Sequence, residues 1–304
     1  MWIASLAFAY ETDQLTRRAE PLGDARDAAN AAANVMLVEA MGRANTLTGC
    51  RAGEEWTRRV LASSIYAFTA RSRYVPARGQ LAGFGYGAFS AWVEQAPLPR
   101  REFVDRDDIY EDLQPTESLV LGSVGVCSTI RVGDVLLGTD KLDHFWEQGY
   151  EYFVESRYGK RDDRALRWGV TTEKGGYGLL TSDVFSYADL YANWAGYRFY
   201  KELLTEDSVF RQDERGCVAM MKPFDWAEWV DDAMDEVLNP PFYDPHVRDA
   251  VRAHLAEERE AVCAGWDVAD ALRRRDAVLA RRPEFVDASA PAWTDEIGLA
   301  ELCR

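Results

Sequence analysis

Glu173 stands at a point in the chain where a helical pattern gives way to glycine. The preceding run, DDRALRWGVTTE over 162–173, has helical character that weakens at Gly169 and the β-branched residues after it. The following KGGYG favours tight turns, so we expect Glu173 at the C-terminal end of a helix. The helix dipole disfavours an anion there, which should raise the pKa of the carboxyl, as a general acid requires. The plain alternative for this residue type is an exposed glutamate in a turn.

Polar side chains cluster soon after Glu173 in the sequence. A glycoside hydrolase needs an acid that protonates the glycosidic oxygen, and groups that position water or stabilise an oxocarbenium-like charge. For that second part we predict Tyr187, Thr181 and Ser182. The side chains predicted to bind sugar are Tyr177, Asp183, Asp189 and Asn193. The alternative for Asp189 is that it only helps to cap its own helix.

Two long strings carry a resemblance to a known family. GTDKLDHF over 138–145 and TEKGGYGLLTSDVFSYADLYAN over 172–193 resemble a group of bacterial proteins that includes the deacetylation-specific lysozyme of predatory bacteria. YETDQLTRR near the N-terminus is also similar to this group, and goose-type lysozymes and lytic transglycosylases are more distantly similar. The resemblance covers about 135–205. It implies a mainly α, lysozyme-like helical domain with one or two small β-hairpins, acting on peptidoglycan glycan strands.

The resemblance also implies roles for individual residues. A catalytic glutamate at a helix end matches Glu173, and an assisting tyrosine is expected about one hairpin further on. At that place this chain has Phe185, with Tyr187 two residues later, so it departs from the family pattern there.

A rival placement of the acid follows from the goose-type pattern. Glu155-Ser156, with Gly178-Leu179-Leu180 further along, is similar to the Glu-Ser and Gly-Leu-Met-Gln elements of those enzymes. On that alignment Glu155 is the acid and Asp183 the second carboxylate, and Glu147 is a third candidate. The spacing of Glu147, Glu151 and Glu155 is also typical of a solvated helix face.

Asp140, Lys141 and His144 form a second group of chemically active residues. Asp140 and His144 lie one helical turn apart, so a metal-dependent hydrolase is an alternative. Carboxylate-bridged di-metal bundles need Glu-x-x-His from two helices, and the chain has no such pair. We therefore expect no metal and no cofactor: Asp140 should cap the helix, and Lys141 and His144 should support the site through hydrogen bonds. The sequence also lacks the G-x-S-x-G pattern of serine hydrolases, the P-loop and the Rossmann glycine pattern.

The net charge of −16 makes nucleic acid an unexpected partner, because an acidic surface repels phosphates. It suits a cationic polymer such as a de-N-acetylated glycan, or it serves only solubility. A non-catalytic envelope protein that binds glycan or a partner is the remaining alternative. We expect a monomer, and no apolar run approaches the roughly 18 residues of a membrane span.

Residues 1–9 resemble the end of a secretory signal, with Ala7-Phe8-Ala9 as the small-residue site, which would leave 10–304 as one catalytic domain with helical extensions. The alternative is that they form an ordinary first strand or helix turn. A secretory signal predicts a secreted or periplasmic protein. In such a compartment the five cysteines would form two disulfides with one left over, whereas in the cytosol they would be buried thiols. No CxxC pair is present, which argues against structural zinc.

The rest of the pattern predicts mostly helices. Asp24 is the expected N-cap of the first helix. The second helix should bury one face, which carries Trp56, Val60, Ile65 and Phe68. The core should contain Trp226, Trp229 and Trp266. The predicted elements are helices over 24–46 and 53–71, an irregular segment over 72–117, a β-hairpin within 118–137, helices over 139–157 and 162–172, a glycine-rich hairpin, and helices over 186–205, 225–238, 244–262 and 266–281.

Overall fold

The computed structural model is mainly helical, and its described part contains three small antiparallel sheets of two strands each. This confirms the predicted fold class. The expected signal remnant 1–9, Tyr177 and Trp266 lie outside the described residues. The structure describes residues 11–70, 87–103, 107–114, 116, 118, 121, 126–176, 178–265, 267–292, 297 and 302–303.

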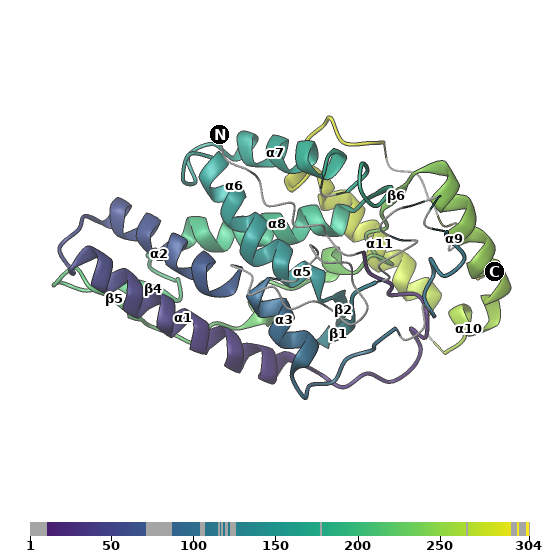
Figure 1. The fold of residues 1–304 in the computed structure, drawn as a ribbon, viewed down its shortest axis with the longest axis horizontal. Coiled ribbons are helices and arrows are strands. Elements are labelled where there is room, and N and C mark those ends of the chain that lie inside the picture. The colour runs from purple at the N-terminus through teal and green to yellow at the C-terminus, as the bar shows by residue number, and fades with distance from the viewer. Residues whose placement is uncertain are drawn as a thin grey trace.

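The centre of the molecule is a crossing of helices from the predicted functional stretch (Figure 1). One arm is continuous from α5 (Asp140–Asp143) through the π-helical turn η1 (His144–Gln148) to α6 (Gly149–Glu155), and it packs on α8 (Tyr187–Glu202). Two glycines allow this close approach. A Cβ on Gly149 would lie 2.7 Å from the Cα of Gly196, and a Cβ on Gly196 would overlap the carbonyl of Phe145.

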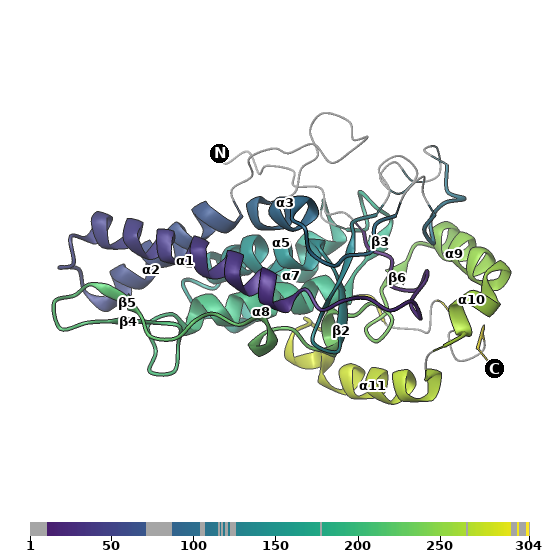
Figure 2. The ribbon, with the colours of Figure 1, turned by 90° about the horizontal axis from the view of Figure 1, so that it is seen from below.

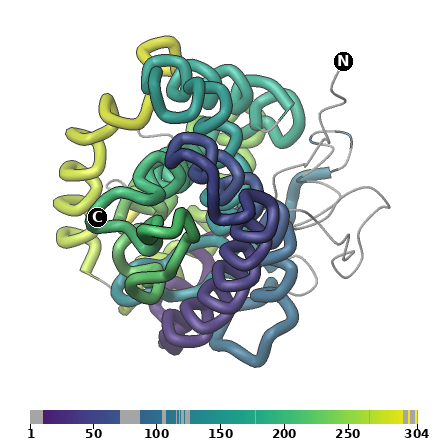
Figure 3. Tube along the Cα trace, turned by 90° about the vertical axis from the view of Figure 1, so that its left-hand side faces the viewer, coloured from purple at the N-terminus to yellow at the C-terminus, as the bar shows by residue number. Residues whose placement is uncertain are grey.

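A long helical hairpin of α1 (Arg26–Thr48) and α2 (Glu54–Thr69) projects from one end of the molecule, nearest the viewer in Figure 3. Small residues let α1 lie close to its neighbours. A disulfide between Cys50 and Cys217 joins the turn of this hairpin to the one formed by β4 (Phe210–Gln212) and β5 (Val218–Met220). The buried residues of α1 are Ala29, Ala33, Leu37, Ala40 and Ala44.

The remaining elements surround the central helices. In Figure 2, α11 (Val268–Arg281) lies along the edge of the molecule opposite to α3 (Ala88–Gln95). A second disulfide joins Cys263 to Cys303, so both predicted disulfides are present, and Cys127 is the free thiol. The other elements are α3 (Ala88–Gln95), β1 (Thr129–Val132), β2 (Val135–Gly138), α7 (Asp162–Lys174), β3 (Val184–Phe185), η2 (Trp226–Glu228), η3 (Asp232–Met234), β6 (Phe242–Tyr243), α9 (Pro245–Glu257), α10 (Arg259–Cys263), α11 (Val268–Arg281) and η4 (Arg282–Glu284).

Aromatic residues fill the main core, as expected. Trp146 and Trp226 are both fully buried, with ring centroids 5.5 Å apart, and Phe145 lies against both rings. Trp229 packs at the edge of the same cluster. Within the described ranges, no helix is both long and apolar enough to cross a membrane.

Several local predictions were wrong. The N-cap of α1 is Ala25, because the carboxylate of Asp24 instead accepts the N–H groups of Arg26 and Gly133. Trp56 is 58% exposed, since α2 buries the neighbouring face that carries Val60. The segment expected to be irregular contains the helix α3.

Two predicted elements around the functional stretch also differ. The glycine-rich stretch after α7 forms turns and not a hairpin, because its strand β3 pairs with the distant β6. The amphipathic segment 225–238 is not one helix: Asp225 and Asp231 cap the two short 3₁₀ turns η2 and η3. These aspartates satisfy local backbone N–H groups, which competes with continuous helix formation.

The helix crossing generates a first prediction. Gly149→Ala would place a methyl group against the backbone of Gly196, which cannot move without shifting α8. We expect the free energy of unfolding to fall by about 1–3 kcal/mol, measured by chemical denaturation. Gly42→Ala is the matched control, because this exposed helical glycine has no atom within 4 Å of the added Cβ. It should stabilise by about 0.5–1 kcal/mol, and equal effects of the two changes would contradict the packing argument.

Candidate active site

The ammonium group of Lys141 lies at the centre of a buried ionic cluster. Its Nζ is 2.6 Å from Asp140 Oδ2, 2.6 Å from Asp189 Oδ1 and 2.8 Å from Glu236 Oε1. The lysine side chain has no exposed surface. Burial works to lower the pKa of Lys141, but the three carboxylates outweigh it and raise the pKa well above its ordinary value. The lysine therefore stays charged, and each of its three N–H groups has an acceptor within reach.

His144 and Asp189 extend the cluster along the crossing of η1 and α8. His144 Nε2 lies 3.1 Å from Asp189 Oδ2, and its Nδ1 lies 2.9 Å from the amide of Asn193. Burial favours a neutral Asp189, yet His144 and Lys141 hold the pKa of this carboxyl well below its usual range. Asp189 is therefore an anion stabilised by Lys141 and His144. Lys141 and His144 thus contact buried carboxylates, and their predicted role in supporting a catalytic site stays a prediction.

Glu173 lies in the last turn of α7, as predicted, and it is only 1% exposed. The alternative of an exposed turn glutamate is wrong. Its Oε1 accepts the backbone N–H of Ser186 at 2.9 Å, while its Oε2 is buried without a hydrogen-bond partner in the described part of the chain. Burial, followed by the charges of Asp189 and Glu11, raises the pKa of Glu173 well above its ordinary value. Both causes favour the protonated form of the Glu173 carboxyl.

Ser186 connects Glu173 to the lysine cluster. It is the N-cap of α8, where its Oγ accepts the backbone N–H of Asp189 at 3.1 Å. The same hydroxyl donates to Glu236 Oε1 at 2.8 Å, and the Ser186 backbone N–H binds Glu173. One capping residue thus orients both carboxyl groups with respect to each other.

Sequence reasoning missed two carboxylates of this site, Glu11 and Glu236. Burial, then Asp189 and Glu236, raises the pKa of Glu11 well above its ordinary value, and Ser182 hydrogen-bonds its carboxyl. Burial also raises the pKa of Glu236 to about 7, against the opposing effect of Lys141. Glu11 lies within the YETDQLTRR string, which was a signal that could have found it. Glu236 lay within a segment predicted as an ordinary amphipathic helix, which concealed it.

The hydroxyl residues predicted around Glu173 fall into two groups. Thr181 and Ser182 lie in the turn after α7, where both hydroxyls donate to the carbonyl of Gly178, at 3.0 and 3.2 Å. Tyr187 is different: its hydroxyl donates to the Pro291 carbonyl at 2.7 Å, and the Arg282 guanidinium lies over its ring. The Tyr187 hydroxyl, one of the three that we expected to position water, therefore already has a hydrogen-bond partner in the C-terminal segment.

Two further aspartates had expected roles: Asp183 in binding sugar and Asp140 in capping a helix. Asp183 has a positive φ of 63°, is partly exposed, and its carbonyl accepts the N–H of Asp244. Asp140 does not cap α5, because the N-cap is Thr139 and the Asp140 carboxylate is bound to Lys141 instead.

The fallback acids lie on the α5–α6 arm. Glu155 is a surface residue, 37% exposed and 3.4 Å from Arg164, as a solvated helix face predicts. Glu147 and Glu151 are also partly exposed, but the surrounding protein removes most of the water from their carboxyl groups, so a solvated face describes them poorly. Burial and the neighbouring carboxylates raise the pKa of Glu147 to about 8. Burial is also the main cause that raises the pKa of Glu151 to about 7.

Asp140, His144 and Asp189 bring potential metal-ligand atoms within 4.8 Å of one another. The Lys141 ammonium lies 2.6 Å from both aspartates, however, and so already neutralises the carboxylates that a metal would need. A second cation there would be repelled by the first. These residues therefore fit a lysine-centred ionic cluster better than a metal site.

Comparison with known proteins finds no match to this chain. No family model, curated protein or solved structure matches it. The family resemblance in the sequence therefore stays a prediction.

The lysine cluster generates a second prediction. Lys141→Met keeps most of the side-chain volume but leaves Asp140, Asp189 and Glu236 without their shared cation. We expect the free energy of unfolding at neutral pH to fall by about 3–5 kcal/mol, measured by chemical denaturation. Lys160→Met is the control, because that ammonium is 59% exposed in its pair with Glu55 and should matter little. A loss no larger than the control's would show that the cluster is not held by Lys141.

The raised carboxyl pKa values generate a third prediction. A carboxyl whose pKa is higher in the folded chain keeps a proton that the unfolded chain loses, so stability falls as the pH rises between the two values. For Glu147 this interval runs from 4.5 to about 8. We expect the free energy of unfolding to decrease across it, and Glu147→Gln to reduce the slope in denaturation curves measured at several pH values. Glu155→Gln, which removes the more exposed carboxyl at the end of α6, should change the slope less than Glu147→Gln does.

Proposed function

We propose that this protein is a glycoside hydrolase of the lysozyme type, which cleaves the glycan strands of peptidoglycan with Glu173 as the general acid. The observation that carries the proposal is the state of Glu173. Burial and neighbouring charge raise its pKa well above the ordinary value, and one oxygen is held by Ser186 while the other has no partner among the described residues. A general acid requires a proton that is retained at working pH and an oxygen from which it can be donated.

The reaction follows from this arrangement. Glu173 Oε2 donates its proton to the glycosidic oxygen as the bond from that oxygen to the sugar carbon breaks. The carboxylate that remains is stabilised by the Ser186 N–H and by the charge of Lys141. Water then adds its hydroxyl to the sugar carbon and returns a proton to Glu173. Ser182, which hydrogen-bonds Glu11 and lies in the turn after α7, is the hydroxyl proposed to position that water once this turn has moved.

Access to Glu173 imposes a condition on this mechanism. The turn after α7 packs directly on the acid, since a Cβ on Gly178 would lie 2.7 Å from Glu173 Oε1. Leu179 also donates its N–H to the Glu173 carbonyl at 2.9 Å. Residues 178–183 must therefore move aside before a glycan reaches the acid. The exposed Leu180 on this turn contributes little that would resist such a movement.

The charge of the chain supports a preference for de-N-acetylated glycan. Removing the acetyl group leaves a cationic amine, which a protein of net charge −16 attracts. A peptidoglycan substrate places the protein in the periplasm or outside the cell. The two disulfides favour the same compartments, because disulfides persist in oxidising surroundings.

A second candidate function follows from the enclosure of the acid. With Glu173 1% exposed, the protein would bind envelope glycan or a partner without cleaving it. The third candidate, a metal-dependent hydrolase that uses Asp140 and His144, is disfavoured by the position of Lys141.

Product analysis by mass spectrometry tests the proposal on native and de-N-acetylated peptidoglycan. We expect the wild type to release muropeptides from the de-N-acetylated material, and Glu173→Gln to reduce release by about 10²–10⁴-fold. Glutamine keeps the shape of a protonated glutamate, so the fold should persist, which a thermal melt checks. Glu155→Gln is the matched control and should retain activity.

Two results would contradict the proposal. No release from either material by the wild type would favour the binding protein. Release that survives in Glu173→Gln would move the acid to Glu147 or, if the control loses activity, to Glu155.

A further inference from the structure

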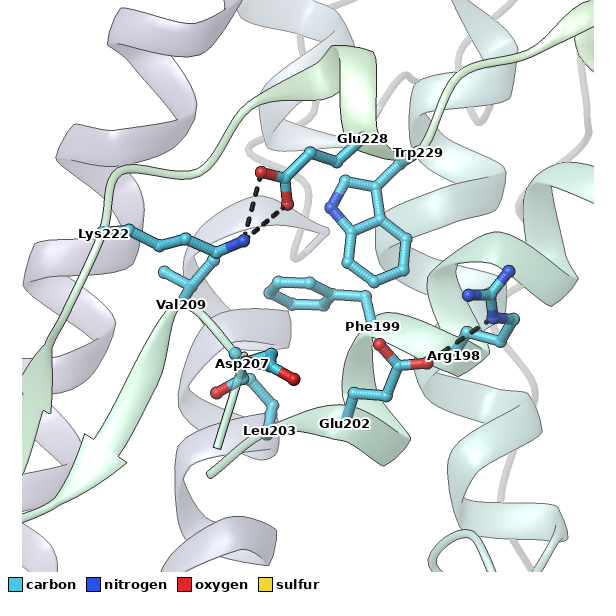
Figure 4. Close-up of a pocket in the computed structure, with 10 residues that line it drawn as sticks. Arg198, Phe199, Glu202, Leu203, Asp207, Val209, Lys222, Glu228 and Trp229 are labelled. Carbon is cyan, nitrogen blue, oxygen red and sulfur yellow. Dashed lines mark hydrogen bonds and ion pairs between the residues drawn. The ribbon is translucent and has the colours of Figure 1, made fainter. Parts of the chain in front are cut away.

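A pocket of about 200 Å³ lies at the C-terminal end of α8, outside the buried ionic cluster (Figure 4). Its walls come from α8, from the segment between α8 and β4, from Lys222 after β5, and from the turn η2. Sites for drug-sized ligands measure about 300–1,000 Å³, so a pocket of this size suits a single ring.

One wall of the pocket is aromatic. Phe199 and Trp229 meet edge to face, with ring centroids 5.5 Å apart, and Figure 4 shows the two rings side by side. The Trp229 Nε1 is buried and has no hydrogen-bond partner in the described part of the protein. A buried indole N–H without an acceptor is costly.

The rim of the pocket carries one unbalanced negative charge. Arg198 lies 3.5 Å from Glu202, and Lys222 lies 2.9 Å from Glu228, so these four charges cancel in pairs. Asp207 forms no ion pair or hydrogen bond with any side chain that the structure describes, and Figure 4 shows its carboxylate at the pocket. The pocket therefore offers an anion to a ligand while its cations are already satisfied.

From this arrangement we propose that the pocket binds a compact ring that carries a protonated amine. The ammonium group pairs with Asp207, and the ring lies against Phe199 and Trp229. Amino sugars and aromatic amines share this chemistry. The site is separate from Glu173 and does not depend on the proposed hydrolysis.

Binding of free monomers tests the site without any turnover. The probes are glucosamine and 2-phenylethylamine, each with a neutral counterpart, N-acetylglucosamine and 2-phenylethanol. Binding is measured on the wild-type protein by the saturable shift of the Trp229 indole signal in ¹H–¹⁵N NMR, which Trp229→Phe assigns. We expect at least one amine to bind at least tenfold more tightly than its neutral counterpart. Glucosamine alone would identify an amino-sugar site, and 2-phenylethylamine alone an aromatic-amine site.

The Asp207→Asn variant tests the role of the charge. We expect it to weaken amine binding at least tenfold, with unchanged binding of the neutral probes. Glu206→Gln is the matched control, because it removes the adjacent exposed charge that is not part of the pocket. The proposal is overturned if no probe shifts the Trp229 signal, if amines and neutral probes bind equally, or if Asp207→Asn binds amines as the wild type does.

Discussion

The buried ammonium of Lys141 is the interaction on which the rest of the structure depends. Three carboxylates surround it within 2.8 Å, and they come from α5, α8 and the segment after η3. Charges buried this deeply are stable only when each has a partner of opposite sign. The lysine therefore determines where these elements meet, and the close glycine contact of α6 with α8 allows them to do so.

The cluster also has too few cations for its carboxylates, and this deficit produces its chemistry. Asp189 remains an anion because both Lys141 and His144 contact it. The charge of Asp189 then adds to burial and raises the pKa of Glu173 and of Glu11 well above the ordinary value. The shortage of cations thus favours the neutral form of these two carboxyl groups. The proposed general acid is thus a consequence of how the whole buried network distributes its charge.

Enclosure has opposite effects on the proposed activity. Burial raises the pKa of Glu173, which a general acid needs, and the same burial keeps substrate out. The turn that covers the acid is held through the backbone at Leu179 and by the close approach of Gly178. The amine pocket at the end of α8 is open by comparison, so the two sites differ in what must happen before a ligand binds.

The sequence alone determined the helical class, the helices over 139–157, 162–172 and 186–205, and the position of Glu173 at a helix end. These features depend on periodicity, helix propensity and glycine within a few turns, which a linear pattern contains. Only the tertiary structure brought Glu11 and Glu236 to Glu173, engaged Tyr187 with the C-terminal segment, and divided 225–238 into short turns. Those outcomes depend on ion pairs and hydrogen bonds between residues far apart in the chain, and local propensity carries no information about such partners.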